Sequence, residues 1–242
     1  MNRNGALIVL CGIDGSGKTV QSELLCQRLQ RAGYRIRNVA FPRYEDGFFG
    51  ELIARYLRGE LSVEGDTLDP YVASLPFACD RWEARPDLRR WLEAGDVIVC
   101  NRYVSANLAH QGSKFASREE LEKFRRWVDT MEYDVFELPR PDLHVWLEVP
   151  PQCAVELIAR KGARSYLQGK TDIHEADIEH LRATARIYRL LAEEDAGWTR
   201  IPCTDEDGMR SIEQISSAVW ENVREILPSD ELSDREKPHA GH

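Results

Sequence analysis

The chain has 242 residues, an apolar content of 43% and a formal net charge of −9. This length allows one large domain or two small ones with a sizeable core, and alternating strand and helix patterns favour one. The acidic balance argues against a broad nucleic-acid surface, and the lack of a leader or membrane-spanning apolar run predicts a cytoplasmic protein without membrane contact.

The first 33 residues carry the clearest local pattern. Residues 7–11 form an apolar run that predicts a buried strand, and helical spacing of apolar residues after Thr19 predicts a helix ending at Gly33. Between them lies GIDGSGKT, residues 12–19, which fits the G-x-x-x-x-G-K-[ST] pattern of a phosphate-binding P-loop. Strand, loop and helix in this order favour binding of a nucleoside triphosphate over a ligand-free glycine turn.

The chemistry of the loop explains its residues. Glycine lets the backbone turn tightly and direct N–H groups inward, and the following helix adds partial positive charge. Lys18 is suited to the β- and γ-phosphates of ATP, and the Thr19 hydroxyl to Mg²⁺. The candidate nucleotide-binding residues of the motif are Gly12, Gly15, Ser16, Gly17, Lys18 and Thr19.

The rest of the chain continues the alternation of strands and helices. Further strands are expected at residues 35–41, 96–101, 142–149 and 198–203. Helices are expected at residues 48–57, 69–85 with a kink at Pro76, 86–95, 117–137, 153–161, 177–194 and 212–227. Residues 228–242 are polar and aperiodic, so we expect one domain over residues 1–227 followed by a disordered tail.

Five strands alternating with helices predict an α/β fold. We expect a P-loop NTPase three-layer sandwich, in which a five-stranded parallel sheet is flanked by helices on both faces and carries a small lid. Ligands of such sheets bind at the carboxyl ends of the strands. The P-loop, residues 41–43 and residues 101–103 all follow predicted strands.

Two arginines follow predicted strands and are candidates for an acceptor phosphate. Phosphoryl transfer depends mainly on positioning and on neutralising the charge of the phosphates. Arg43 and Arg102 stand near strand ends, where a guanidinium group can grip a phosphate with two hydrogen bonds. The alternative for Arg43 is a solvated loop charge.

Four segments together resemble one enzyme family. They are GIDGSGKT at residues 12–19, FPRY at 41–44, FACDR at 77–81 and NRYVSANLAHQG at 101–112, with DIHE at 172–175 as a weaker fifth. In their order and spacing the chain resembles the thymidylate kinases, P-loop enzymes that transfer a phosphate from ATP to dTMP. The resemblance covers about residues 6–227 and implies ATP and Mg²⁺ as cofactors.

The resemblance implies a substrate site that is formed by residues from several segments of the chain. Its residues would be Asp14, Phe41, Arg43, Tyr44, Phe77, Arg81, Arg102, Tyr103, Asn107, His110 and Gln111. Phe77 would stack on thymine and Arg81 would donate to a carbonyl oxygen of the base. Without the resemblance, Phe77 would be interpreted as core and Arg81 as a partner of Asp80.

The remaining substrate residues would contact the base edge and the sugar. The side-chain amides of Asn107 and Gln111 suit pyrimidine edges. Asp14 would contact a sugar hydroxyl or the metal shell, and it counts among the nucleotide-binding candidates as well. Tyr103 and His110 would lie near the deoxyribose, where their bulk disfavours a 2′-hydroxyl.

A basic segment at about residues 160–171 resembles the lid of the family. In the family a catalytic basic residue stands either inside the P-loop or in the lid. Residues 13–16 contain no basic residue, so the lid is expected to supply it. Arg164 is the first candidate and Arg160 the second, whereas the alternative is a solvated basic loop. The expected catalytic set is Lys18, Arg102 and Arg164.

The chain departs from the family pattern at Asn101, where the family has an aspartate that helps to hold Mg²⁺. Asparagine keeps one acceptor oxygen but loses the charge. The expected metal-binding residues are therefore Thr19, Asp14 and Glu175, with Glu148 as a further compensating carboxylate.

Several functions remain open at this point. The leading one is dTMP kinase; the alternatives are a kinase for another or modified pyrimidine deoxynucleotide, and a nucleotide-binding protein without catalysis. A GTPase is disfavoured because no N-K-x-D motif occurs, and a deoxynucleoside kinase because no base follows the third strand. The resemblance also implies a homodimer, with apolar helices at Phe77 and residues 124–131 as its face. The six cysteines, without a C-x-x-C pair, are expected to be reduced core residues.

Overall fold

The computed structural model describes residues 4–61, 68–160 and 178–227. A five-stranded sheet has the order β2-β3-β1-β4-β5, and every adjacent pair is parallel. The strands are β1 (Ala6–Cys11), β2 (Ile36–Ala40), β3 (Val97–Asn101), β4 (Leu143–Glu148) and β5 (Trp198–Pro202). The predicted α/β sandwich is therefore confirmed.

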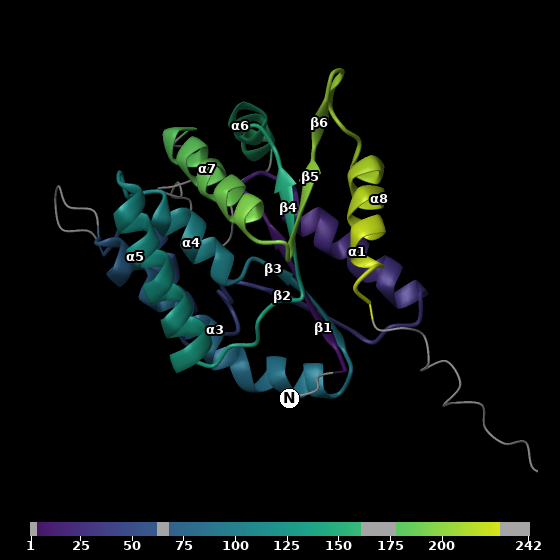
Figure 1. The fold of residues 1–242 in the computed structure, drawn as a ribbon, viewed down its shortest axis with the longest axis horizontal. Helices are drawn as coiled ribbons and strands as arrows, with labels where there is room; N and C mark the ends of the chain where they lie inside the picture. Colours follow the sequence, from purple (N-terminus) through teal and green to yellow (C-terminus); the bar gives the residue numbers. More distant parts are fainter. Residues whose placement is uncertain (1–3, 62–67, 161–177, 228–242) are drawn as a thin grey trace, which may run out of the picture.

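Helices cover both faces of this sheet (Figure 1). On one face α1 (Lys18–Arg31) packs against α8 (Ile212–Val223). On the other face α4 (Val104–Gly112) lies among α3 (Pro70–Glu93), α5 (Arg118–Asp129) and α7 (Ile178–Glu194). The remaining elements are α2 (Gly50–Leu57), α6 (Pro151–Ala159), the π-helix η1 (Thr130–Val135) and a hairpin of β6 (Thr204–Asp205) and β7 (Gly208–Met209).

The core lies around β1 and its two neighbours. All six residues of β1 are buried, as are the first four of β3 and the first five of β4. Continuous apolar runs of this kind suit strands that are covered by helices on both sides. Burial on both faces holds the carboxyl ends of β1 and β3 in place, and the loops that follow them are positioned accordingly.

Helix α3 differs from the prediction. We expected two helices over this region, but one continuous helix of 24 residues contains both Pro76 and Pro86. Its start is well defined, because the Asp69 carboxylate accepts a hydrogen bond from the Tyr71 N–H at 2.8 Å. Each internal proline removes a backbone hydrogen bond. Tertiary packing of the buried residues of α3 overrides this local penalty.

The β6–β7 hairpin, α4 and the π-helix form of η1 were not predicted. Residues 104–112 form α4 directly after the third strand, and the chain after α5 continues as a π-helix. The spacing of Val104 and Leu108, both buried, was a signal for α4. Single π-turns occur frequently at functional sites, which directs attention to η1.

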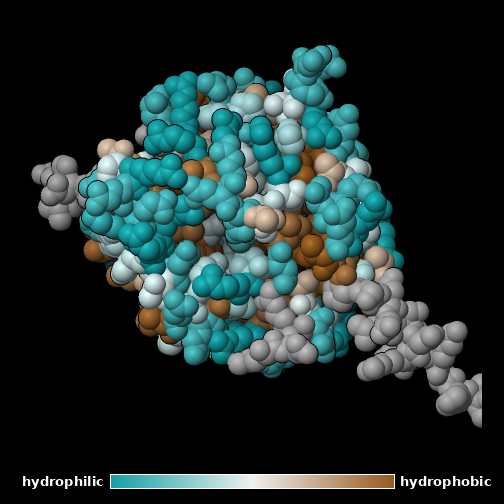
Figure 2. Space-filling model, viewed as in Figure 1, coloured by the Kyte–Doolittle hydropathy of each residue, from teal (hydrophilic) through white to brown (hydrophobic). Residues whose placement is uncertain are grey.

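The side chains of the described residues present a mostly hydrophilic surface, with scattered apolar areas in the view of Figure 2. Within residues 4–61, 68–160 and 178–227, no helix combines the length and the apolar character that crossing a bilayer requires.

The cysteines agree in part with the expectation of reduced core residues. All six are free, and Cys11, Cys26, Cys100 and Cys203 are buried, but Cys79 and Cys153 are only partly buried. Burial raises the pKa of the Cys11 thiol to about 12, so it stays protonated and unreactive at neutral pH.

Acid is expected to destabilise the protein through His144. This imidazole is buried and stacks on the Trp198 ring with centroids 4.4 Å apart, and burial lowers its pKa from 6.5 to about 4. Between these values the unfolded chain binds more protons than the folded one, so stability falls as the pH falls. When the pH falls from 7 to 4.5, the unfolding free energy of the unmodified chain should fall by about 2 kcal/mol more than that of the His144→Gln variant, which lacks the titrating imidazole. Urea denaturation at both pH values measures this; equal losses would contradict it.

Candidate active site

The P-loop connects β1 to α1 and depends on its glycines. Gly15 and Gly17 have φ values of +79° and +84°, which other residues rarely adopt. A Cβ at Gly15 would also approach the Ala154 carbonyl oxygen of α6 to 2.5 Å. The loop is therefore packed directly on α6, and it places the first residues of α1 at the carboxyl end of β1.

Lys18 is almost fully buried within this loop. Its ammonium donates to the carbonyl oxygens of Gly12 and Ile13 at 3.0 and 2.7 Å and to the Ser16 hydroxyl at 3.3 Å. These contacts hold the charge at the base of the loop, near the N-terminus of α1, where an anion is favoured.

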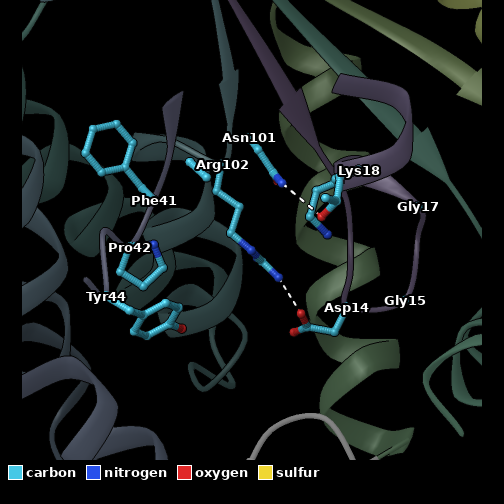
Figure 3. A pocket seen from close by; sticks show the side chains of 11 residues that line it. Asp14, Gly15, Gly17, Lys18, Phe41, Pro42, Tyr44, Asn101 and Arg102 are labelled. Atoms are coloured by element: carbon cyan, nitrogen blue, oxygen red, sulfur yellow. Dashed lines mark hydrogen bonds and ion pairs between the residues drawn. The ribbon is translucent and has the colours of Figure 1, made fainter. Parts of the chain in front are cut away.

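A pocket of about 260 Å³ opens in front of the P-loop. Its lining residues are Asp14, Gly15, Gly17, Lys18, Thr19, Ala40, Phe41, Pro42, Tyr44, Asn101 and Arg102 (Figure 3). They come from the carboxyl ends of β1, β2 and β3, as expected for a parallel α/β sheet. Phe41, Tyr44 and Arg102 thus join the predicted nucleotide residues in one pocket.

Arg102 reaches across this pocket to the P-loop (Figure 3). Its Nη2 lies 2.5 Å from Oδ1 of Asp14, and its Nη1 lies 2.8 Å from Nε2 of His110. The backbone at Arg102 has a φ of +67°, an unusual value for a residue other than glycine. Such outliers concentrate at functional sites, and this one directs the guanidinium group away from the sheet into the pocket.

Asn101, the last residue of β3, lies beside Thr19. Its Nδ2 donates to Thr19 Oγ1 at 3.3 Å. Its Oδ1 is buried and has no hydrogen-bond partner within the described residues. Buried polar atoms are nearly always paired, so this oxygen calls for an explanation.

Mg²⁺ fits the oxygen atoms at this end of the pocket. The Thr19 hydroxyl and the amide oxygen of Asn101 are hard donors, which Mg²⁺ prefers, and Mg²⁺ usually takes its other ligands from phosphates and water. No group of three His, Cys, Asp or Glu in the described ranges could hold a metal by itself. Glu148 is bound by Arg189 and Arg200 at 2.9 and 2.5 Å, which argues against it as the compensating carboxylate.

A second cluster of predicted residues lies in the interior rather than in the pocket lining. Arg81 is paired through Nε and Nη2 with the Glu132 carboxylate of η1 at 2.6 and 2.7 Å. Asn107 donates through Nδ2 to Glu132 Oε1 at 3.0 Å and to the Ser74 carbonyl oxygen at 3.1 Å. The alternative of an Arg81–Asp80 pair is wrong, and Glu132 is a residue that the sequence analysis missed.

Gln111 and Phe77 extend this cluster toward α2. Gln111 Oε1 accepts from the Lys114 ammonium at 2.8 Å, and Lys114 also donates to the Tyr56 hydroxyl at 3.2 Å. The Phe77 ring meets Tyr56 edge-on with centroids 6.0 Å apart. Lys114 was not predicted, although a cation three residues after Gln111, just beyond the end of α4, was a signal for it.

Arg43 does not line the pocket with Arg102, contrary to the expectation of two phosphate-binding arginines. Its Nε and Nη2 bind Asp80 and Glu83 of α3 at 2.9 and 2.6 Å. Asp80 is fully buried and needs a compensating charge. Arg43 therefore ties the loop after β2 to α3, and it is not a solvated loop charge either.

Tyr103 is also placed differently from the prediction. It is fully buried, its hydroxyl donates to the Pro139 carbonyl oxygen at 3.1 Å, and its ring packs on Phe41. We therefore assign it to the core beneath the pocket instead of to the deoxyribose.

The predicted lid lies mostly outside the described residues. Arg164 and Glu175 fall in the range 161–177, which the structure does not describe. Arg160 is described, and it is exposed at the C-terminus of α6, the helix on which Gly15 packs.

A P-loop faced by an arginine from the next strand of a parallel sheet defines a P-loop phosphotransferase. Comparison with protein families sharpens this class, because the model of the thymidylate kinase family matches residues 10–217. The chain therefore belongs to the thymidylate kinase family.

Individual relatives agree with this assignment. Thymidylate kinase from Homo sapiens is 30% identical over 237 residues, which are 98% of this chain and 96% of the relative. Thymidylate kinase from Mycobacterium tuberculosis is 31% identical over 193 residues, covering 79% and 87% of the two chains. The solved thymidylate kinase of Candida albicans has the same fold, with a TM-score of 0.70 at 22% identity over 93% of each chain. The activity of the family is the ATP-dependent phosphorylation of dTMP.

Proposed function

We propose that this protein transfers the γ-phosphate of ATP to dTMP in the pocket before the P-loop, giving dTDP for dTTP synthesis. The observation that carries this proposal is the position of Arg102. Its guanidinium group lines the same pocket as Lys18 and reaches Asp14 of the P-loop at 2.5 Å. Two anion-binding groups, one at the start of α1 and one directly after β3, thus face one space, as a donor phosphate and an acceptor phosphate require.

On the donor side, the backbone of the P-loop and the start of α1 would hold the ATP phosphates. The Lys18 ammonium would exchange its bonds to the loop carbonyls for phosphate oxygens. Arg160 and Arg164, in the segment of residues 160–171 that we assign to a lid, would add positive charge and exclude water at the transfer step.

On the acceptor side, Arg102 would bind the dTMP phosphate and Asp14 would hold Arg102 or the sugar hydroxyl. His110 contacts Arg102 at 2.8 Å and would lie near the deoxyribose. Phe41 and Tyr44 line the pocket wall. Phe77, Arg81, Asn107 and Gln111 would then form the thymine site behind this wall, where their polar groups are already oriented by neighbouring residues.

Thr19 and Asn101 would hold Mg²⁺ together with the ATP phosphates, and the ion would supply positive charge that neutralises the phosphates during transfer. Asn101 would accept a hydrogen bond from a metal-bound water through its unpaired Oδ1. In this assignment Asn101 replaces the usual aspartate without loss of catalysis, since Mg²⁺ draws most of its ligands from phosphate and water.

Release of ADP tests the proposal directly. A coupled assay with ATP and Mg²⁺ should compare dTMP, dUMP, dCMP, UMP and no acceptor. We expect robust turnover with dTMP and the highest kcat/KM for this acceptor. A higher kcat/KM for another pyrimidine nucleotide would overturn dTMP as the acceptor. Binding of ATP and dTMP without release of ADP would show that the protein binds nucleotides but does not catalyse transfer.

We also propose that the protein is a homodimer through α3. Of the two helices predicted for the dimer face, residues 124–131 do not fit, because Phe124 and Met131 are buried. The other, the helix at Phe77, is part of α3, which exposes Val72, Leu75 and Trp82 by 52%, 39% and 45%. Their spacing of three and seven residues places them on one side of the helix, an apolar stripe suited to a second copy.

A charge in this stripe should separate the subunits. Trp82→Lys is expected to raise the dissociation constant of the dimer at least about 30-fold, because exposed tryptophans are frequent interface hot spots. Sedimentation across a range of concentrations measures this. Met209→Lys, on the exposed β6–β7 hairpin, is the matched control and should leave the dimer intact. A wild-type chain that sediments as a monomer would contradict the proposal.

We place the protein in the cytoplasm, because six free cysteines, four of them buried, suit a reducing compartment.

A further inference from the structure

Glu132 is a fully buried carboxylate that no part of the proposed transfer chemistry uses. It lies on the π-helix η1 and has no exposed surface. A carboxylate in the interior is costly unless its oxygens accept several hydrogen bonds. The partners of Glu132 are Arg81 from α3 and Asn107 from α4, so three elements meet at this one side chain.

The contacts of Glu132 determine how Asn107 is oriented. Asn107 faces Glu132 Oε1 at 3.0 Å and the Ser74 carbonyl oxygen at 3.1 Å. An ionised carboxylate and a carbonyl can only accept hydrogen bonds. The amide must therefore turn its NH₂ group toward both of them, and its oxygen is left as the acceptor on the other side.

The same contacts determine how Arg81 is presented. Glu132 accepts from Nε and Nη2, which occupies one edge of the planar guanidinium group. The group keeps further N–H donors and has no acceptor. Burial alone lowers the pKa of Arg81, but the Glu132 carboxylate and its hydrogen bonds reverse this and raise the pKa, so Arg81 stays charged in the interior.

We propose that Glu132 is a positioning residue for base specificity, which presents Arg81 as donor and Asn107 as acceptor to the pyrimidine. This inference rests on the proposed function, in which both residues read the base. Thymine and uracil offer a donor at N3 and an acceptor at O4, which match this pair. Cytosine offers an acceptor at N3 and a donor at its 4-amino group, so both contacts become repulsive or unpaired.

Glu132→Gln tests the inference with little change in shape. The amide cannot supply acceptors to all three N–H groups, because its own NH₂ would face either Arg81 Nε or both Arg81 Nη2 and Asn107 Nδ2. We expect KM for dTMP to rise at least tenfold, while KM for ATP stays within twofold. Values of kcat/KM for dTMP and dUMP should fall together, because the two bases share the same edge at N3 and O4.

The decisive quantity is selectivity, measured as the inhibition constant of dCMP divided by KM for dTMP in the same preparation. This ratio does not depend on the fraction of active enzyme, so a partly unfolded variant still gives an answer. We expect the ratio to fall at least tenfold in Glu132→Gln.

Asp96→Asn is the matched control for loss of a buried carboxylate. Asp96 is 1% exposed and pairs with Arg37 and Arg35 at 2.8 and 3.1 Å, outside the pocket and the base cluster. This variant should keep the dCMP ratio and KM for dTMP unchanged even if it is less stable. An unchanged dCMP ratio in Glu132→Gln, or an equal change in Asp96→Asn, would overturn the role of Glu132. A wild-type protein without dTMP turnover would instead overturn the proposed function.

Discussion

Replacing Arg102 by alanine is expected to lower kcat/KM for dTMP by a factor of about 10² to 10³, the scale of a lost charged contact to a transition state. Arg102 places its guanidinium group in the pocket with only 18% of its side chain exposed. Its loss would leave the Asp14 carboxylate facing the incoming phosphate, so attraction would turn into repulsion. Steady-state kinetics with dTMP varied at saturating ATP measure the effect.

The backbone at position 102 does not complicate this comparison. Alanine and arginine both carry a Cβ, so both bear the cost of the φ of +67°. Arg102→Lys keeps the positive charge but cannot form two parallel hydrogen bonds to a phosphate. Its kcat/KM for dTMP should therefore lie between the values of Arg102→Ala and the wild type. If kcat/KM for dTMP falls by less than tenfold in Arg102→Ala, the assignment of Arg102 to the acceptor site is wrong.

Replacing Asn101 by alanine is expected to lower kcat by about 10- to 100-fold at limiting Mg²⁺. Asn101 holds Thr19 through Nδ2 and leaves Oδ1 unpaired at the end of the pocket where we propose that Mg²⁺ binds. Alanine removes both functions, so the hydroxyl of Thr19 loses its orientation and one acceptor for metal-bound water is lost. The measurement is kcat as a function of free Mg²⁺ at saturating ATP and dTMP.

Asn101→Asp is the matched variant with almost the same shape. It adds a negative charge beside the metal and should lower the half-saturating Mg²⁺ concentration by about 3- to 10-fold. Identical Mg²⁺ curves for the wild type, alanine and aspartate would show that position 101 does not contact the metal shell.

The P-loop could be predicted because its structure is local. The strand, the turn and the helix are consecutive in the chain, and the positive φ values at Gly15 and Gly17 demand glycine. The same holds for Asn101 and Arg102, which end and directly follow the buried strand β3 and must therefore lie at the carboxyl edge of the sheet.

Helix α3 shows where local rules fail. Two prolines predict breaks, yet the helix runs from Pro70 to Glu93. The breaks are local penalties of about 3 kcal/mol each, whereas the packing of α3 against α4 and β3 depends on residues distant in the chain. No short stretch of the sequence contains both the proline penalties and the distant packing contacts that outweigh them.

The sequence by itself determined the class of fold, the phosphate-binding loop and the place of Arg102 after a buried strand, because these follow from periodicity and adjacent residues, whereas Phe41 and Tyr44 of the pocket were expected only from the family resemblance. Only the tertiary structure decided the partners of the buried charges. Arg43 pairs with Asp80, 37 residues away, and Arg81 with Glu132, 51 residues away. A buried charge must find a partner, but any carboxylate that the fold brings near satisfies this need, so the choice depends on how helices pack and not on the local sequence.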